Sequence, residues 1–89
     1  MIEQNATIVN RLGLHARAAA KLVTCASQFS SAVQVSYNDQ EVNGKSIMGV
    51  MMLAAAKGSE ITLIVEGEDE AETIEALITL IADRFGEVE

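Results

Sequence analysis

The chain has 89 residues, of which 49% are apolar, and it contains no proline, one cysteine and one histidine. This length can bury one small core, whereas two separate units would each be too small to fold unaided, so we expect a single domain over residues 1–89. One cysteine forms no internal disulfide. One cysteine and one histidine also fall short of a four-ligand zinc site unless carboxylates or a second chain complete it, so we expect no metal.

The net charge of −7 is spread unevenly along the chain. Residues 1–59 carry five basic and three acidic side chains, whereas residues 60–89 carry ten acidic side chains and Arg84. Without a basic cluster, nucleic acid and anionic membranes are poor partners. The acidic third is typical of a solvated helix face, and the mildly positive remainder suits an anionic partner or group. No run of about 18 apolar residues and no secretory signal pattern is present, so we expect a cytoplasmic protein without membrane insertion.

The first half of the chain predicts a strand, a helix and a hairpin. Residues 2–9 alternate weakly and lead into a turn over residues 10–13. Small and apolar side chains recur at helical spacing over residues 16–28. Residues 33–37 alternate again, and turn residues separate them from a short strand over 41–43. These strands are expected to pair as a hairpin.

The second half predicts a helix, a strand and a last helix. Ser46 is a candidate N-cap for a largely apolar helix over residues 47–56, which Lys57–Gly58 is expected to close. Residues 60–66 alternate as a fourth strand. Asp69 and Glu72 have capping-box spacing before a helix whose apolar stripe ends near Gly86. The order β-α-β-β-α-β-α favours an α+β fold with one mostly antiparallel sheet and all helices on one face.

His15 lies between a glycine turn and the start of the first predicted helix. At that end of a helix, free backbone N–H groups and the positive end of the helix dipole favour an anion. A neutral imidazole there offers a nucleophilic ring nitrogen, and Arg17 can bring several donors to the same oxygens. These parts suit a group that accepts a phosphoryl on nitrogen. The residues alone leave a second reading open, in which His15 merely caps the helix or packs at the turn, because no further catalytic group completes a triad.

Two separate segments carry a family resemblance. Residues 12–19 read LGLHARAA, and residues 44–55 read GKSIMGVMMLAA. The first resembles the active-site signature of the HPr family, the histidine-containing phosphocarriers of the bacterial phosphoenolpyruvate-dependent sugar phosphotransferase system, and the second is similar to that family's serine-site segment. The likeness covers essentially the whole chain. It implies an open-faced β-sandwich with a four-stranded sheet and three helices.

The resemblance also implies a function. His15 would take a phosphoryl group on Nδ1 from phosphorylated enzyme I and pass it to an enzyme IIA domain, with Arg17 stabilising the phosphoryl oxygens. Such a protein is a phosphoryl carrier rather than a stand-alone enzyme; it needs no cofactor, and we expect a monomer. Exposed apolar residues of the short helix would dock both partners, since methionine adapts to unlike surfaces; these residues are Ile47, Met48, Met51 and Met52. Val50 and Leu53 are expected in the core.

Ser46 has two compatible roles. As an N-cap, its hydroxyl contributes about 1 kcal/mol to the helix. Matched to the family, it is the residue that HPr kinase/phosphorylase phosphorylates in some bacteria, and the added charge would repel acidic partner surfaces. Two alternatives stay open: a carrier of the nitrogen-related branch of the same system, and a regulatory binding module controlled at Ser46 in which His15 is idle.

Ala18 departs from the family pattern, which usually has proline at this position. Proline in a first helical turn restricts the unfolded chain, so alanine forgoes about 0.4–1 kcal/mol of stability. Alanine also adds one backbone donor close to His15. Because alanine is a strong helix former, we expect the site to survive the change.

Overall fold

The computed structural model describes all residues, 1–89, and has the predicted element order. The strands are β1 (Ile2–Thr7), β2 (Ala32–Tyr37), β3 (Gln40–Asn43) and β4 (Glu60–Glu66). The helices are α1 (Ala16–Ser27), α2 (Ile47–Met52) and α3 (Glu70–Ala82), followed by a short 3-10 turn, η1 (Arg84–Gly86). None of these helices is long and apolar enough to cross a bilayer.

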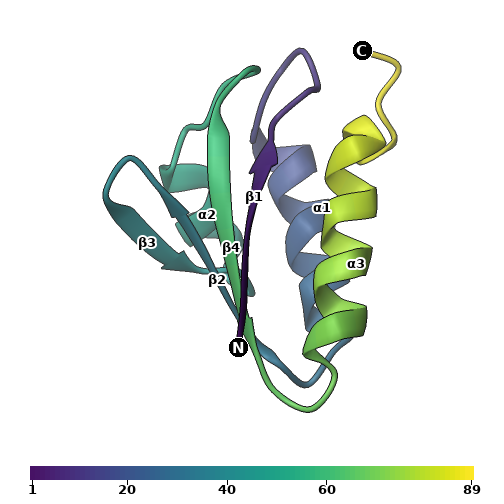
Figure 1. Cartoon of the computed structure of the whole chain (residues 1–89). Helices are drawn as coiled ribbons and strands as arrows, with labels where there is room; N and C mark the ends of the chain where they lie inside the picture. The colour runs from purple at the N-terminus through teal and green to yellow at the C-terminus, as the bar shows by residue number, and fades with distance from the viewer.

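The four strands form one sheet in the order β1-β4-β2-β3, and every neighbouring pair is antiparallel. Helices α1 and α3 lie side by side against this sheet, and α2 contacts α1 and β3 (Figure 1). The predicted α+β fold, an open-faced β-sandwich with three helices, is therefore confirmed.

The core lies between the sheet and the helices. Alternate residues of the central strands are buried there, as the alternating pattern predicts: Val33, Val35, Ile61, Leu63 and Val65. The facing helices contribute mainly small side chains from α1 and larger ones from α3: Ala18, Ala19, Leu22, Ala26, Ile74, Leu77 and Ile81. Val50 and Leu53 are also buried, which confirms their predicted place in the core.

Helix α2 is shorter than predicted. It ends at Met52 rather than continuing to residue 56, and Ala54 adopts the left-handed region with φ of 52°. The physical reason is a tertiary contact of the segment after the helix: the left-handed backbone at Ala54 turns the chain out of the helix, and the carbonyl of Ala55 accepts the backbone N–H of Leu14 at 2.9 Å. Lys57–Gly58 does not cap the helix, and the N–H of Gly58 instead donates to the carbonyl of Ile8 at 2.7 Å.

The predicted capping box at the start of α3 is wrong. Asp69 occupies the N-cap position, but its carboxylate makes no capping bond. It accepts hydrogen bonds from the backbone N–H of Ser30 at 3.0 Å, from the N–H of Ser31 at 2.9 Å and from the Ser31 hydroxyl. These bonds, the hydroxyl first, lower the pKa of Asp69 to about 2. The carboxylate therefore links the start of α3 to the loop before β2 instead of capping α3.

Asp69→Asn should lower the stability of the protein at neutral pH, because each carboxylate oxygen accepts a different backbone N–H and the amide replaces one of these acceptors with a donor. A carboxyl whose pKa is lowered by folding contributes stability that is fully present above its unfolded pKa of about 3.9 and is lost as the pH falls through its folded value. The difference in Tm between parent and variant should therefore be several degrees and constant from about pH 7 to about pH 5, and should shrink between about pH 4 and about pH 2.

Thermal unfolding followed by circular dichroism across this range measures the effect. Asp39→Asn is the matched control, because Asp39 lies in an exposed turn with φ of 66°, which asparagine tolerates. A Tm difference for Asp69→Asn that stays constant down to pH 2 would contradict the role assigned to the carboxylate.

Candidate functional site

His15 lies at the start of α1, as predicted. It is the N-cap residue, with extended backbone angles (φ −74°, ψ 178°), but its side chain makes no capping hydrogen bond. The first bond of the helix runs from the N–H of Ala19 to the carbonyl of His15 at 2.8 Å, so the N–H groups of residues 16–18 have no acceptor within the protein. The alternative in which the ring caps the helix is therefore wrong, whereas the alternative in which it packs at the turn is not decided by this observation. The free amides lie beside the ring and favour an anion there.

Gly13 sets the position of the loop that carries His15. Its φ of +69° is in the left-handed region, and a Cβ built on it would lie 2.5 Å from the carbonyl oxygen of Ala55. That carbonyl also accepts the N–H of Leu14. Because a side chain at residue 13 would meet backbone, the close approach requires glycine. The histidine loop is thus fixed against the segment that follows α2.

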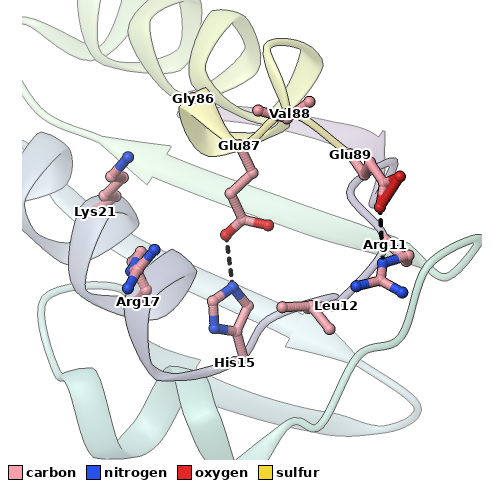
Figure 2. A pocket seen from close by; sticks show the side chains of 9 residues that line it. All are labelled: Arg11, Leu12, His15, Arg17, Lys21, Gly86, Glu87, Val88 and Glu89. Atoms are coloured by element: carbon pink, nitrogen blue, oxygen red, sulfur yellow. Dashed lines mark hydrogen bonds and ion pairs between the residues drawn. The ribbon is translucent and has the colours of Figure 1, made fainter.

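The imidazole of His15 is paired with a carboxylate. Its Nε2 lies 2.5 Å from Oε2 of Glu87, and the two side chains are 28% and 14% exposed (Figure 2). The other carboxylate oxygen accepts a hydrogen bond from Nδ2 of the buried Asn10 at 3.0 Å. The bond from Asn10, followed by the one from His15, holds the pKa of Glu87 below its usual range. Glu87 is therefore an ionised carboxylate at neutral pH.

Glu87 belongs to a C-terminal segment, residues 86–89, that folds back over the site. The reversal occurs at Arg84 and Phe85, which both adopt left-handed φ values of 56° and 54°. Phe85 is fully buried and anchors the near end of the segment. At the far end, the backbone carbonyl of Glu89 accepts a hydrogen bond from the N–H of Arg11. The side-chain carboxylate of Glu89 lies 3.1 Å from Nε of Arg11. The segment is therefore held on both sides of Glu87.

The C-terminal segment and the start of α1 enclose an open cavity of about 390 Å³. Arg17 lines it together with His15, as the sequence predicts. Lys21 lies one turn further along α1 on the same side of the cavity, and its Nζ donates to the carbonyl of Phe85 at 2.7 Å (Figure 2). The cavity thus combines one imidazole with the cations of Arg17 and Lys21, a combination that suits a phosphoryl-sized anion.

The predicted docking residues are exposed on α2, with Met48 at 76% and Met52 at 72%, and with Ile47 and Met51 less so. Leu12, from the histidine loop, adds a further exposed apolar side chain that lines the cavity. The hydroxyl of Ser46 accepts the N–H of Gly49 at 3.1 Å, which confirms Ser46 as the N-cap of α2. Ser46 and the exposed methionines thus share one short helix that contacts α1.

Sequence reasoning missed Asn10, Lys21 and Glu87 as parts of the site. Asn10 is recognisable from sequence only as a turn residue, and Lys21 only as a polar position outside the apolar stripe of α1. Glu87 was included in the acidic third that is typical of a solvated face. Its place beside His15 depends on two residues with left-handed backbone angles, neither of which is a glycine. No local sequence pattern predicts that turn.

Comparison with known proteins identifies the family. The family model described as "PTS HPr component phosphorylation site" matches residues 2–83. The chain belongs to the HPr family. The membership that the two motifs indicate is thereby confirmed, while the C-terminal segment that carries Glu87 lies beyond the matched residues.

Relatives of the family match this chain over its full length. The phosphocarrier protein HPr of Neisseria meningitidis is 58% identical and that of Cupriavidus necator 56% identical, each over 89 residues covering 100% of both chains. The crystal structure of an HPr from Thermoanaerobacter tengcongensis superposes with a TM-score of 0.95 at 47% identity and covers 100% of both chains.

Ala18→Pro should stabilise this HPr-family protein. Ala18 lies in the first turn of α1, and its N–H has no acceptor in the protein, so the ring removes no hydrogen bond. We expect the free energy of unfolding to rise by about 0.4–1 kcal/mol, because proline restricts the unfolded chain. Urea unfolding measures this, with Ala16→Ser, an exposed position in the same turn, as a control. A loss of stability would mean that the buried position 18 has no room for the pyrrolidine ring of proline.

Proposed function

We propose that this protein is a cytoplasmic phosphocarrier of bacterial sugar uptake, in which His15 accepts a phosphoryl group on Nδ1 from phosphorylated enzyme I and passes it to enzyme IIA domains. Family membership and relatives named phosphocarrier protein HPr support this function. The geometry supports the choice of nitrogen. Because Nε2 is engaged by Glu87, Nδ1 is the ring nitrogen left with a free lone pair.

The transfer is a displacement at phosphorus. The lone pair of Nδ1 attacks the phosphorus of the donor's phosphohistidine, the donor N–P bond breaks, and its electron pair returns to the donor nitrogen. Positioning and electrostatic stabilisation dominate such reactions. Arg17, which lines the cavity and has no carboxylate partner within 4.0 Å, can pair with the phosphoryl oxygens, together with the free amides of residues 16–18. Transfer to enzyme IIA repeats the step with His15 as donor.

Phosphorylation with enzyme I and labelled phosphoenolpyruvate tests the proposal. The parent and Ser46→Ala should take up one acid-labile, base-stable label, and His15→Ala should take up none. Label that persists in His15→Ala would contradict the assignment of His15. Label that appears only from ATP at Ser46 would support the regulatory binding module instead.

The same assay separates the two branches of the phosphotransferase system. A sugar-branch carrier takes label from the enzyme I of that branch and yields it to sugar-specific enzyme IIA domains. A carrier of the nitrogen-related branch would show the same chemistry at His15 but would exchange label only with the enzymes of that branch.

Ser46 is proposed as a regulatory phosphorylation site for HPr kinase/phosphorylase in cells that contain it. Its hydroxyl is partly exposed and lies at the end of the helix that carries the exposed methionines. A phosphate there would place about two negative charges beside the docking surface, where they would repel acidic partners.

Met48→Ser should weaken docking to enzyme I and to enzyme IIA alike, because the same exposed residue is expected to be buried by each partner in turn. Loss of one buried methionine side chain corresponds to roughly a tenfold rise in KM, with the maximal transfer rate unchanged. Steady-state transfer kinetics with each partner measure this. Ala71→Ser, exposed on α3, is the control. An unchanged KM for both partners would remove Met48 from the docking surface.

A further inference from the structure

The contact between His15 and Glu87 selects one tautomer of the neutral imidazole. Glu87 Oε2 lies 2.5 Å from Nε2, and it is the only carboxylate oxygen within hydrogen-bond distance of the ring. A neutral imidazole carries one proton, and an ionised carboxylate only accepts, so the proton sits on Nε2. Figure 2 shows the other ring nitrogen on the edge turned away from Glu87. The carboxylate thus leaves the lone pair on Nδ1.

The carboxylate is itself held in place by Asn10. Nδ2 of this fully buried side chain donates to Oε1 of Glu87 at 3.0 Å and to the carbonyl of Gly13 at 2.8 Å. Both partners are acceptors, so the orientation of the amide is determined. With the C-terminal segment anchored at Phe85 and at Arg11, Glu87 meets the ring without a large loss of side-chain freedom.

We propose that Glu87 is a positioning residue for phosphoryl transfer: it holds Nε2–H so that Nδ1 faces the incoming phosphorus, and it balances the positive charge that the ring acquires. The inference rests on the proposed carrier function. When Nδ1 gives its lone pair to phosphorus, the donor nitrogen recovers the electron pair of the broken N–P bond. Nε2 keeps its proton throughout. The phosphorylated ring is therefore cationic until the group leaves, and a carboxylate stabilises it as the aspartate of a Ser-His-Asp triad stabilises imidazolium.

The surrounding charges make this compensation necessary. Cations on α1 and in the histidine loop disfavour a further positive charge on the ring, and the second carboxylate of the C-terminal segment is paired with Arg11. Helix α2 has no acidic residue in its first turn. The charged groups that line the cavity besides His15 and Glu87 are Arg11, Arg17, Lys21 and Glu89.

Glu87→Gln and Glu87→Ala separate the two contributions of the carboxylate. Glutamine keeps an acceptor oxygen for Nε2–H but loses the charge, whereas alanine loses both. At saturating phosphorylated enzyme I, we expect transfer to His15 to slow about tenfold in Glu87→Gln and further in Glu87→Ala, which corresponds to losing one charge-assisted hydrogen bond. The KM should stay unchanged. Glu72→Gln, exposed on α3, makes the same change of charge away from the site and should transfer at the parental rate.

A spectroscopic readout excludes a merely structural effect. In ¹⁵N spectra of the unphosphorylated imidazole, the parent and Glu87→Gln should show the Nε2–H tautomer, and Glu87→Ala should show a mixture of the two tautomers.

Parental transfer rates in both variants, or a parent without a dominant Nε2–H tautomer, would each overturn the proposal. If the parent takes no label from enzyme I, the carrier function fails and the positioning role falls with it. The spectra of the unphosphorylated ring would then still report whether Glu87 holds Nε2–H, so the two failures are distinguishable.

Discussion

The close approach of Gly13 to Ala55 is the constraint on which the arrangement of the site depends. A left-handed glycine lets the histidine loop lie against the backbone that follows α2, and the N–H of Leu14 closes the contact. This contact orients the start of α1, so that His15 and the free amides lie together. It also ends α2 early. The helix that carries the exposed methionines and the loop that carries the histidine, far apart in the sequence, are thus joined by a single backbone approach.

Periodicity and capping residues predicted most of the fold. The alternation in β2 and β4 and the spacing of small residues in α1 depend on burial against one face, which a sequence displays directly. Ser46 was also recognisable, because its capping bond is local. The length of α2 and the role of Asp69 were predicted wrongly for a common reason. In both cases a tertiary hydrogen bond, to Ala55 or from Ser30 and Ser31, holds the backbone or side chain away from the local structure that the pattern favours.

The site was predicted only in part. His15 and Arg17 belong to one continuous motif at one helix start, so the sequence itself brings them to the same region. Asn10 and Glu87 are 77 residues apart in the sequence. Their contact needs a buried amide, a buried aromatic anchor and two residues in the left-handed region, none of which charge or hydropathy reveals. Within the acidic last third, composition does not reveal that the carboxylate of Glu87 faces a histidine rather than solvent.

The pairing of His15 with Glu87 has a consequence for the order of events on the ring. One edge of the imidazole is covered by the carboxylate of Glu87 and by the C-terminal segment that carries it, so the edge with Nδ1 is the one that stays open. Under the proposed carrier function, the phosphoryl donor and the phosphoryl acceptor both have to approach this open edge. The two partners then cannot bind at the same time, and the phosphorylated protein has to dissociate from the first before it binds the second.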